Sequence, residues 1–233
     1  MNQENQKYRD RGLFYGSDGQ SLISPYDSAR PLFEPKIRLG ILASGNGSNF
    51  KYIIKSIQNK QLNAEICILI VNNPNCLAIK KAIKYEIPYL VINHKDCDSR
   101  LEHDKLVMNK LEELNVELVV MAGWMRIVGE NLINKFKHRL INIHPSLLPS
   151  FKGVDAIKQA LDSSVKITGC TVHHVQKEVD SGSIIIQAAV PLKEKDNKDT
   201  LKKRIQEMEH IILPIAIAKV AKNIRTTSIK DKK

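Results

Sequence analysis

The sequence lacks the features that mark membrane, secreted and zinc-binding proteins. No apolar run approaches the roughly 18 residues that a membrane-spanning helix needs. The stretch 1–12 contains no apolar segment of the kind that a secretory signal carries. The cysteines, Cys67, Cys76, Cys97 and Cys170, have unrelated spacings and form no CxxC pair. We therefore predict reduced thiols, no metal site, no membrane association and a cytoplasmic location.

Acidic residues are in the minority, because 36 Lys and Arg face 25 Asp and Glu, for a net charge of +11. Such an excess is found in proteins that bind nucleic acid and in proteins that bind small anions. Clusters such as Lys80–Lys81 and Lys202–Arg204 fall in predicted helices, and no basic stretch is interleaved with aromatic residues. We interpret the charge as a solvated lysine-rich surface and predict no nucleic-acid partner.

The pattern along the chain divides it into three parts. Residues 1–35 contain prolines and glycines without apolar periodicity, which predicts an extension that is disordered or draped over the main fold. The main domain is predicted over 36–223, and a polar, basic tail over 224–233.

Buried strands alternate with helices in the first half of the domain. The strands are expected over 37–43, 66–71, 89–92, 118–123 and 140–143, and the helices near 48–59, 76–86 and 98–114. Strands that are apolar throughout and alternate with helices predict a parallel sheet covered on both faces. The sequence therefore predicts an open, doubly wound, mainly parallel α/β fold of the Rossmann-like kind.

The rhythm changes in the second half. Strands are expected over 167–175 and 184–192, and their connection is too short for a crossover helix, so they should pair antiparallel. A final helix is predicted from Asp199 or Thr200 to about Lys222, with Asp199 as its N-cap.

The segment INIHPSLLPS, residues 141–150, ends a predicted strand with two polar side chains. Asn142 and His144 share one strand face and reach the edge where open α/β sheets bind ligands. An amide can donate to an oxyanion, and an imidazole can exchange protons near neutral pH. Pro145 and Pro149 stiffen the loop that follows. The alternative interpretation is a structural histidine followed by a rigid turn.

Three other segments each admit a functional and a structural interpretation. SGNGSN (44–49) is either an anion site at a helix N-terminus or a tight turn with Ser48 as N-cap. MAGWMRIV (121–128) is either an apolar wall for a flat ring or a core strand end with one surface arginine. Asp180 is either a turn residue or a partner that orients His144 and favours the imidazolium.

Taken together, SGNGSN, MAGWMRIV, INIHPSLLPSFKG and GCTVHHV with VDSGSIIIQAAVPL resemble phosphoribosylglycinamide formyltransferase over about residues 36–223. The resemblance implies the formyltransferase variant of the Rossmann-like fold and a role in purine biosynthesis. The implied reaction moves a formyl group from 10-formyltetrahydrofolate, a co-substrate, to the primary amine of glycinamide ribonucleotide through a tetrahedral intermediate. It implies no metal and only small-molecule partners, for a monomer or a homodimer.

The resemblance also implies roles for individual residues. The catalytic trio would be Asn142, His144 and Asp180. The phosphate of the ribonucleotide would be held by Gly47, Ser48 and Asn49, and its ribose by Glu209. The folate would be contacted by Arg100 near its tail and by two loops, which comprise Met125, Arg126, Ile127 and Val128, and Gln176, Lys177, Glu178 and Val179. The sequence departs from the family pattern at Trp124, where phenylalanine is frequent, at Ser181, where glycine is common, and over 153–161, where a histidine is often found.

Three alternatives compete with this interpretation. A formyltetrahydrofolate hydrolase would share the fold and the trio but usually carries an N-terminal regulatory domain, for which 1–35 is too short. Methionyl-tRNA formyltransferase would need a further C-terminal domain. A non-enzymatic nucleic-acid-binding module would explain the charge but not the trio. The segments SGNGSN and EMEHIILP favour a phosphorylated amine as the acceptor.

Overall fold

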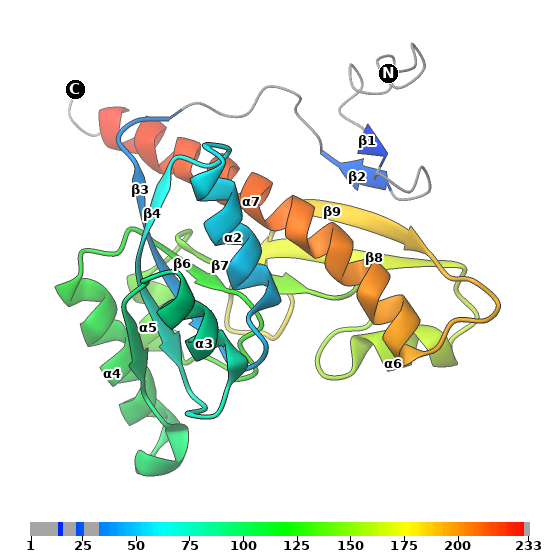
Figure 1. Ribbon diagram of the computed structural model, residues 1–233, viewed down its shortest axis with the longest axis horizontal. Helices are drawn as coiled ribbons and strands as arrows, with labels where there is room; N and C mark the ends of the chain where they lie inside the picture. The colour runs from blue at the N-terminus through cyan, green and yellow to red at the C-terminus, as the bar shows by residue number, and fades with distance from the viewer. Residues whose placement is uncertain (1–13, 16–21, 26–32, 231–233) are drawn as a thin grey trace.

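Five parallel strands form one half of a single mixed sheet (Figure 1). The protein is described from a computed structural model, which covers residues 14–15, 22–25 and 33–230. The parallel strands are β3 (Ile37–Ala43), β4 (Ala64–Val71), β5 (Tyr89–Val91), β6 (Leu118–Met121) and β7 (Leu140–His144). They lie in the order β7-β6-β3-β4-β5, so the chain reverses direction across the sheet as the doubly wound prediction requires.

The other half of the sheet is antiparallel. β8 (Ile167–His174) pairs with β7 on one side and with β9 (Ile184–Pro191) on the other, which confirms the predicted antiparallel pair. Two short strands, β2 (Leu22–Ser24) and β1 (Phe14–Tyr15), extend the sheet beyond β9. The sequence did not predict these two strands, because strands of two or three residues are too short to show a periodic pattern. Ile23 is fully buried where β2 pairs with β9.

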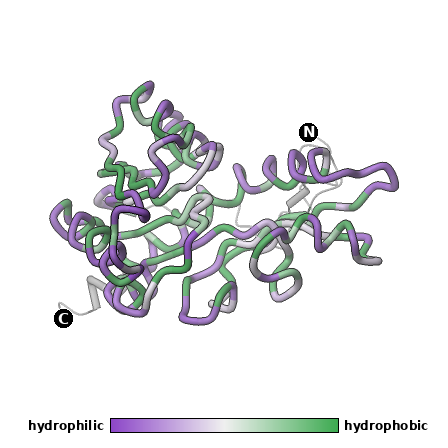
Figure 2. The backbone as a smooth tube through the Cα atoms, turned by 90° about the horizontal axis from the view of Figure 1, so that it is seen from below, coloured by the Kyte–Doolittle hydropathy of each residue, from purple (hydrophilic) through white to green (hydrophobic). Residues whose placement is uncertain are grey.

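Helices cover both faces of the sheet. On one face lie α2 (Ser48–Gln58), α3 (Leu77–Lys84), α6 (Ala156–Asp162) and α7 (Lys198–Lys230). On the other lie α4 (Arg100–Glu113) and α5 (Glu130–Lys135), and a 3-10 turn, η1 (His94–Asp96), precedes α4. Neighbouring strand residues serve opposite faces: Ile41 packs in the first core and Leu42 in the second. Figure 2 shows the apolar strands inside and polar residues on the outer helices.

Helix α7 differs from its prediction at both ends. Asn197 is the residue whose side chain accepts the N–H groups of Asp199 and Thr200, each at 3.0 Å, so the prediction of Asp199 as N-cap is wrong. The helix continues past Lys222 to Lys230. Its distal turns are fixed because Arg225 binds both carboxylate oxygens of Glu117, at 2.6 and 2.8 Å. None of the helices in the described ranges is long and apolar enough to span a membrane.

Candidate active site

The end of β7 and the connection between β8 and β9 meet to form the centre of the site. His144 is the last residue of β7, and Asn142 precedes it by two. Nδ1 of His144 lies 3.3 Å from Oδ2 of Asp180, and both side chains are buried. The sequence left it open whether Asp180 reaches His144, and the structure brings them together.

The contacts of His144 and Asp180 fix both side chains. Nε2–H of His144 donates to the carbonyl of Phe151 at 2.8 Å, so both ring nitrogens face hydrogen-bond acceptors. Asp180 also accepts from the N–H of Gly153 at 2.9 Å. Burial acts to raise the pKa of Asp180, but its contacts with His173, Gly153 and His144 together hold that pKa below the ordinary value. The carboxylate is therefore charged, and it lies between the rings of His144 and His173.

His173 is a member of this cluster that the sequence analysis did not identify. In the antiparallel register of β7 and β8 it lies opposite Asn142. Its Nε2 is 3.3 Å from Nδ2 of Asn142 and 3.5 Å from Oδ1 of Asp180, and its Nδ1–H donates to the carbonyl of His174. The missing signal was the pairing of β7 with β8, because that pairing places one of the two consecutive histidines beside the trio.

Side chains of β8 and β9 hold the loop that follows His144. The hydroxyl of Thr171 donates to the carbonyl of Ser146 at 2.7 Å and accepts from the N–H of Leu148 at 3.1 Å. The side-chain amide of Gln187 donates to the carbonyl of Leu148 at 2.9 Å. The predicted stiffness of this loop therefore rests on buried hydrogen bonds as well as on its prolines.

The turn between β3 and α2 leaves the N-terminus of that helix without a side-chain cap. Gly47 is the N-cap of α2 and has a φ of 66°, in the left-handed region that favours glycine. A Cβ on Gly47 would lie 2.8 Å from the Cβ of Ala78, so a side chain would also be too large there. Ser48 is the first helical residue and no side chain caps α2, so the interpretation of Ser48 as N-cap is wrong. No side chain caps the first N–H groups of α2, and such a helix N-terminus has the polarity that suits an anion.

Two residues predicted to bind the ribonucleotide are joined directly, although 160 positions separate them. Nδ2 of Asn49 donates to Oε2 of Glu209 at 2.9 Å, linking α2 to α7. Oδ1 of Asn49 is buried without a hydrogen-bond partner. Burial raises the pKa of Glu209 above its ordinary value, although the hydrogen bond from Asn49 and the charge of Lys202 act against this.

The two predicted folate loops follow the ends of β6 and β8. In the first, Met125 and Ile127 expose 82% and 54% of their surface, whereas Val128 is buried. The backbone N–H of Met125 donates to the hydroxyl of Ser44 at 2.9 Å, which ties this loop to the start of the anion turn. Nε of Arg126 is buried without a partner.

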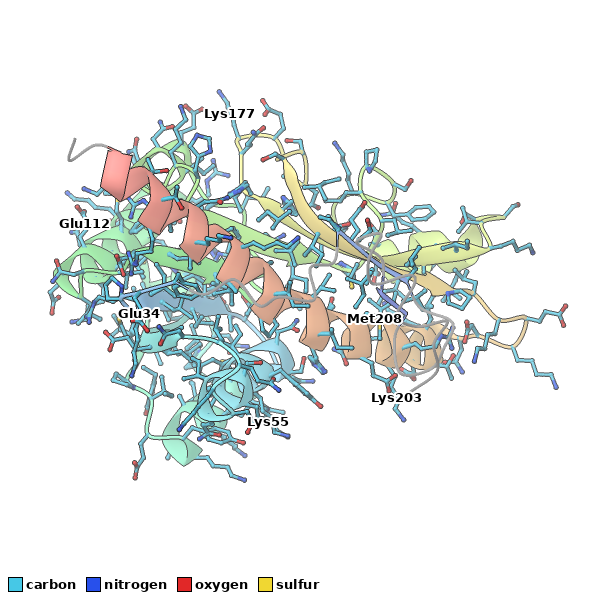
Figure 3. The ribbon with its side chains drawn as sticks, turned by 90° about the horizontal axis from the view of Figure 1, so that it is seen from above. Glu34, Lys55, Glu112, Lys177, Lys203 and Met208 are labelled. Atoms are coloured by element: carbon cyan, nitrogen blue, oxygen red, sulfur yellow. The ribbon has the colours of Figure 1, made fainter. Side chains whose placement is uncertain are left out.

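The second loop connects β8 to β9, and its residues 176–179 are exposed. Figure 3 shows Lys177 at the outer end of this connection. Its Nζ lies 2.6 Å from a carboxylate oxygen of Glu130, at the start of α5. Because Glu130 follows the first loop closely, this ion pair links the two loops. Arg100 is exposed in the first turn of α4, and in the described ranges no hydrogen bond or ion pair joins it to the other candidate residues.

The fold and the site define an α/β enzyme whose amide, imidazoles and carboxylate can stabilise an oxyanion and move protons. The chain belongs to the formyl transferase family, whose model matches residues 37–217. This confirms the predicted fold class and family.

Curated relatives include the trifunctional purine biosynthetic protein adenosine-3 of Gallus gallus and of Homo sapiens. Each is 44% identical over 186 residues, which cover 80% of this chain and 18% of the relative. The chain thus spans less than a fifth of the length of these relatives.

Solved structures match over nearly their whole length. The phosphoribosylglycinamide formyltransferase of Bacillus halodurans is 39% identical with a TM-score of 0.76, over 78% of this chain and 94% of that chain. The glycinamide ribonucleotide transformylase 1 of Symbiobacterium toebii is 36% identical with a TM-score of 0.80, over 84% and 94%.

Proposed function

We propose that the protein transfers a formyl group from 10-formyltetrahydrofolate to the primary amine of glycinamide ribonucleotide in purine biosynthesis. The observation that carries the proposal is the meeting of Asn142, His144 and Asp180 between an anion-binding turn and two exposed loops. The names of the relatives with solved structures support the same reaction. The proposal includes no metal and no nucleic-acid partner, places the protein in the cytoplasm, and is compatible with a monomer or a homodimer.

The ribonucleotide would occupy the side formed by α2 and α7. Its phosphate would bind the N–H groups of Gly47, Ser48 and Asn49, where the helix N-terminus favours negative charge. The free Oδ1 of Asn49 and the carboxyl of Glu209 are acceptors, which suit ribose hydroxyls rather than a phosphate. The side chain of Asn49 would therefore recognise the sugar, and only its backbone the phosphate.

The folate would occupy the side formed by the two loops. Exposed apolar side chains fit a flat ring, because contact would remove their surface from water. Met125 and Ile127 present such surface from the first loop and Val179 from the second. The backbone of residues 125–128 would pair with the polar edge of the ring, and Arg100 would approach its acidic tail.

The mechanism follows from the groups at the end of β7. The amine of the ribonucleotide attacks the formyl carbon, and negative charge develops on the formyl oxygen. The amide of Asn142 and the imidazolium of His144 donate to that oxygen, and the carboxylate of Asp180 orients the imidazolium. The attacking nitrogen must lose a proton and the departing folate nitrogen must gain one, for which His144 or a water held by Asp180 would serve as the shuttle. Nε2–H of His144 is bonded to Phe151, so this bond must exchange for one to the substrate.

An absorbance assay of tetrahydrofolate release, run with and without glycinamide ribonucleotide, tests the proposal. We expect release only when the amine is present. Equal release without the amine would mean that water is the acceptor, and hydrolysis would replace transfer as the function.

A further inference from the structure

Two adjacent residues of α4, outside the candidate catalytic and binding residues, contact both ends of the loop 125–128. His103 is fully buried and Asp104 is 3% exposed. The ring of His103 lies against that of Trp124, with centroids 5.8 Å apart and planes tilted by 32°. Oδ2 of Asp104 accepts the backbone N–H of Gly129 at 2.5 Å. Trp124 precedes the loop and Gly129 follows it, so the pair holds the loop at its two ends.

The pair is itself fixed in place. Nε2–H of His103 donates to the carbonyl of Ile92 at 3.0 Å, just after β5, and Nδ1 lies 3.6 Å from Oδ1 of Asp104. The approach of Asp104 to the loop is close, because a Cβ on Gly129 would lie 2.9 Å from Oδ2 of Asp104. A buried carboxylate needs hydrogen-bond partners, and one of those found here is the backbone at the end of the loop.

We propose that His103 and Asp104 are positioning residues that set the place of the loop 125–128 for folate binding. The identity of the ligand rests on the proposed function, whereas the hold on the loop rests on the contacts alone. If Asp104 did no more than accept the N–H at the start of the short helix α5, replacing it would lower stability. Any loss of affinity would then affect both substrates alike. A hold at both loop ends instead predicts a defect specific to the folate.

The protein carries its own probe of this loop, because Trp124 is its single tryptophan. Intrinsic fluorescence therefore reads the environment at the first end of the loop without any ligand. In Asp104→Ala we expect red-shifted emission and stronger acrylamide quenching at a temperature where the protein is folded. By calorimetry, the Kd for tetrahydrofolate should rise about tenfold, because the loop released by the substitution must be ordered again when the folate binds. The Kd for glycinamide ribonucleotide should stay within about twofold, since in the described ranges no hydrogen bond or ion pair joins His103 or Asp104 to Asn49 or Glu209.

Two further variants separate positioning from general loss of stability. Asp104→Asn keeps an oxygen that can accept from Gly129, so it should restore most of the fluorescence and the folate affinity. The control is Leu111→Ala, which removes a buried side chain from the same helix. Leu111 packs against Gly40 of β3, because a Cβ on Gly40 would lie 2.4 Å from Cδ2 of Leu111. This control variant should lower the Tm and leave Trp124 fluorescence and the folate Kd unchanged. If Asp104→Ala does not fold, Gly129→Ala tests the same contact, with changes in the same direction as those expected for Asp104→Ala.

The proposal is overturned if Asp104→Ala, or Gly129→Ala in its place, leaves both fluorescence and the folate Kd as in the wild type. It is also overturned if Leu111→Ala reproduces both changes. Failure of the folate assignment gives a different result: the wild type would not bind tetrahydrofolate, while Asp104→Ala would still shift the Trp124 emission. If water proves to be the acceptor, the wild type still binds tetrahydrofolate and the test of the loop is unchanged.

Discussion

The centre of the site and the proposed ribonucleotide side each contain a buried carboxyl group, and these two carboxyl groups have different partners. Asp180 lies between His144 and His173 and accepts the N–H of Gly153, and its pKa is lowered. Glu209 accepts the side-chain amide of Asn49, and its pKa is raised. Burial is the largest influence on both pKa values and raises each of them, so the partners decide the opposite outcomes.

In the proposed function, this difference distinguishes a catalytic region around Asp180 from a binding region around Glu209. Around Asp180 the protein itself supplies two imidazole rings and a backbone N–H, so the carboxylate is charged before any substrate arrives. Around Glu209 the protein supplies fewer donors, and the ligand can provide the rest. If the proposed roles hold, the catalytic charge is pre-organised, whereas the charge of Glu209 would be stabilised when the ribose hydroxyls arrive.

The largest effect, on turnover, should come from His144→Ala, which removes the imidazole from the proposed catalytic region. Turnover should fall by about 10²–10⁴-fold, because a general acid–base group is lost, while the KM values change little. Steady-state kinetics with both substrates varied would measure this. The matched control is His138→Ala, which removes an exposed imidazole and should keep full activity. Near-normal turnover in a folded His144→Ala variant would falsify the catalytic assignment.

Next in size is Glu209→Gln, which changes the binding region alone. The KM for glycinamide ribonucleotide should rise by about 10–100-fold, since hydrogen bonds to a charged acceptor are lost. Turnover at saturation and the KM for the folate should be nearly unchanged. Glu207→Gln, an exposed carboxyl on the same helix, is the control. A loss of turnover as large as that of His144→Ala would remove the distinction between the two regions.

A smaller effect is expected on stability in Asp180→Asn. Because folding lowers the pKa of Asp180 below its ordinary 3.8, the carboxylate stabilises the fold above that pH. This stabilisation is lost as the pH falls through the pKa of the folded state. Asp180→Asn should therefore cost about 1 kcal/mol at pH 7, and the difference from the wild type should shrink in acid. Urea unfolding of both proteins at neutral and at acidic pH measures this difference in the free energy of unfolding. A difference that does not change with pH would contradict the lowered pKa of Asp180.

The smallest effect, with the opposite sign, is expected for the stability of Glu209→Gln without ligand. Because folding raises the pKa of Glu209 above its ordinary 4.5, stability is lost as the pH rises through the window between the two values. Gln removes this cost, so the variant should match or slightly exceed the wild type at pH 7. The gain should vanish below pH 4.5. Destabilisation at neutral pH would show that Asn49 compensates the charge of Glu209 fully.

Local pattern predicted much of the fold and part of the site. The apolar runs predicted the parallel strands, and the period of two in a strand placed Asn142 and His144 on one face. Glu209 came only from the family resemblance, and for Asp180 the sequence left a turn residue as the alternative, because no spacing in the sequence indicates which distant segments meet. Neither the local pattern nor the family resemblance predicted the direct hydrogen bond between Asn49 and Glu209.

Contacts between strands account for most of what was missed. His173 depends on the register of β7 with β8, and β2 depends on an available edge of β9. Local sequence encodes neither of these pairings, because the energy lies in hydrogen bonds and packing between distant segments. The end of α7 was misjudged for the same reason, since Arg225 is held by Glu117 and not by helical periodicity.

The pairing of β2 with β9 also bears on how the protein can be handled. The stretch that matches the family model, 37–217, excludes both β2 and Arg225. A chain shortened to that stretch would expose the free backbone groups of β9, which are a template for strands of other molecules. Residues 22–24 cover that edge by pairing with β9, so we expect a chain that keeps them to aggregate less in crystallisation and in concentrated stocks.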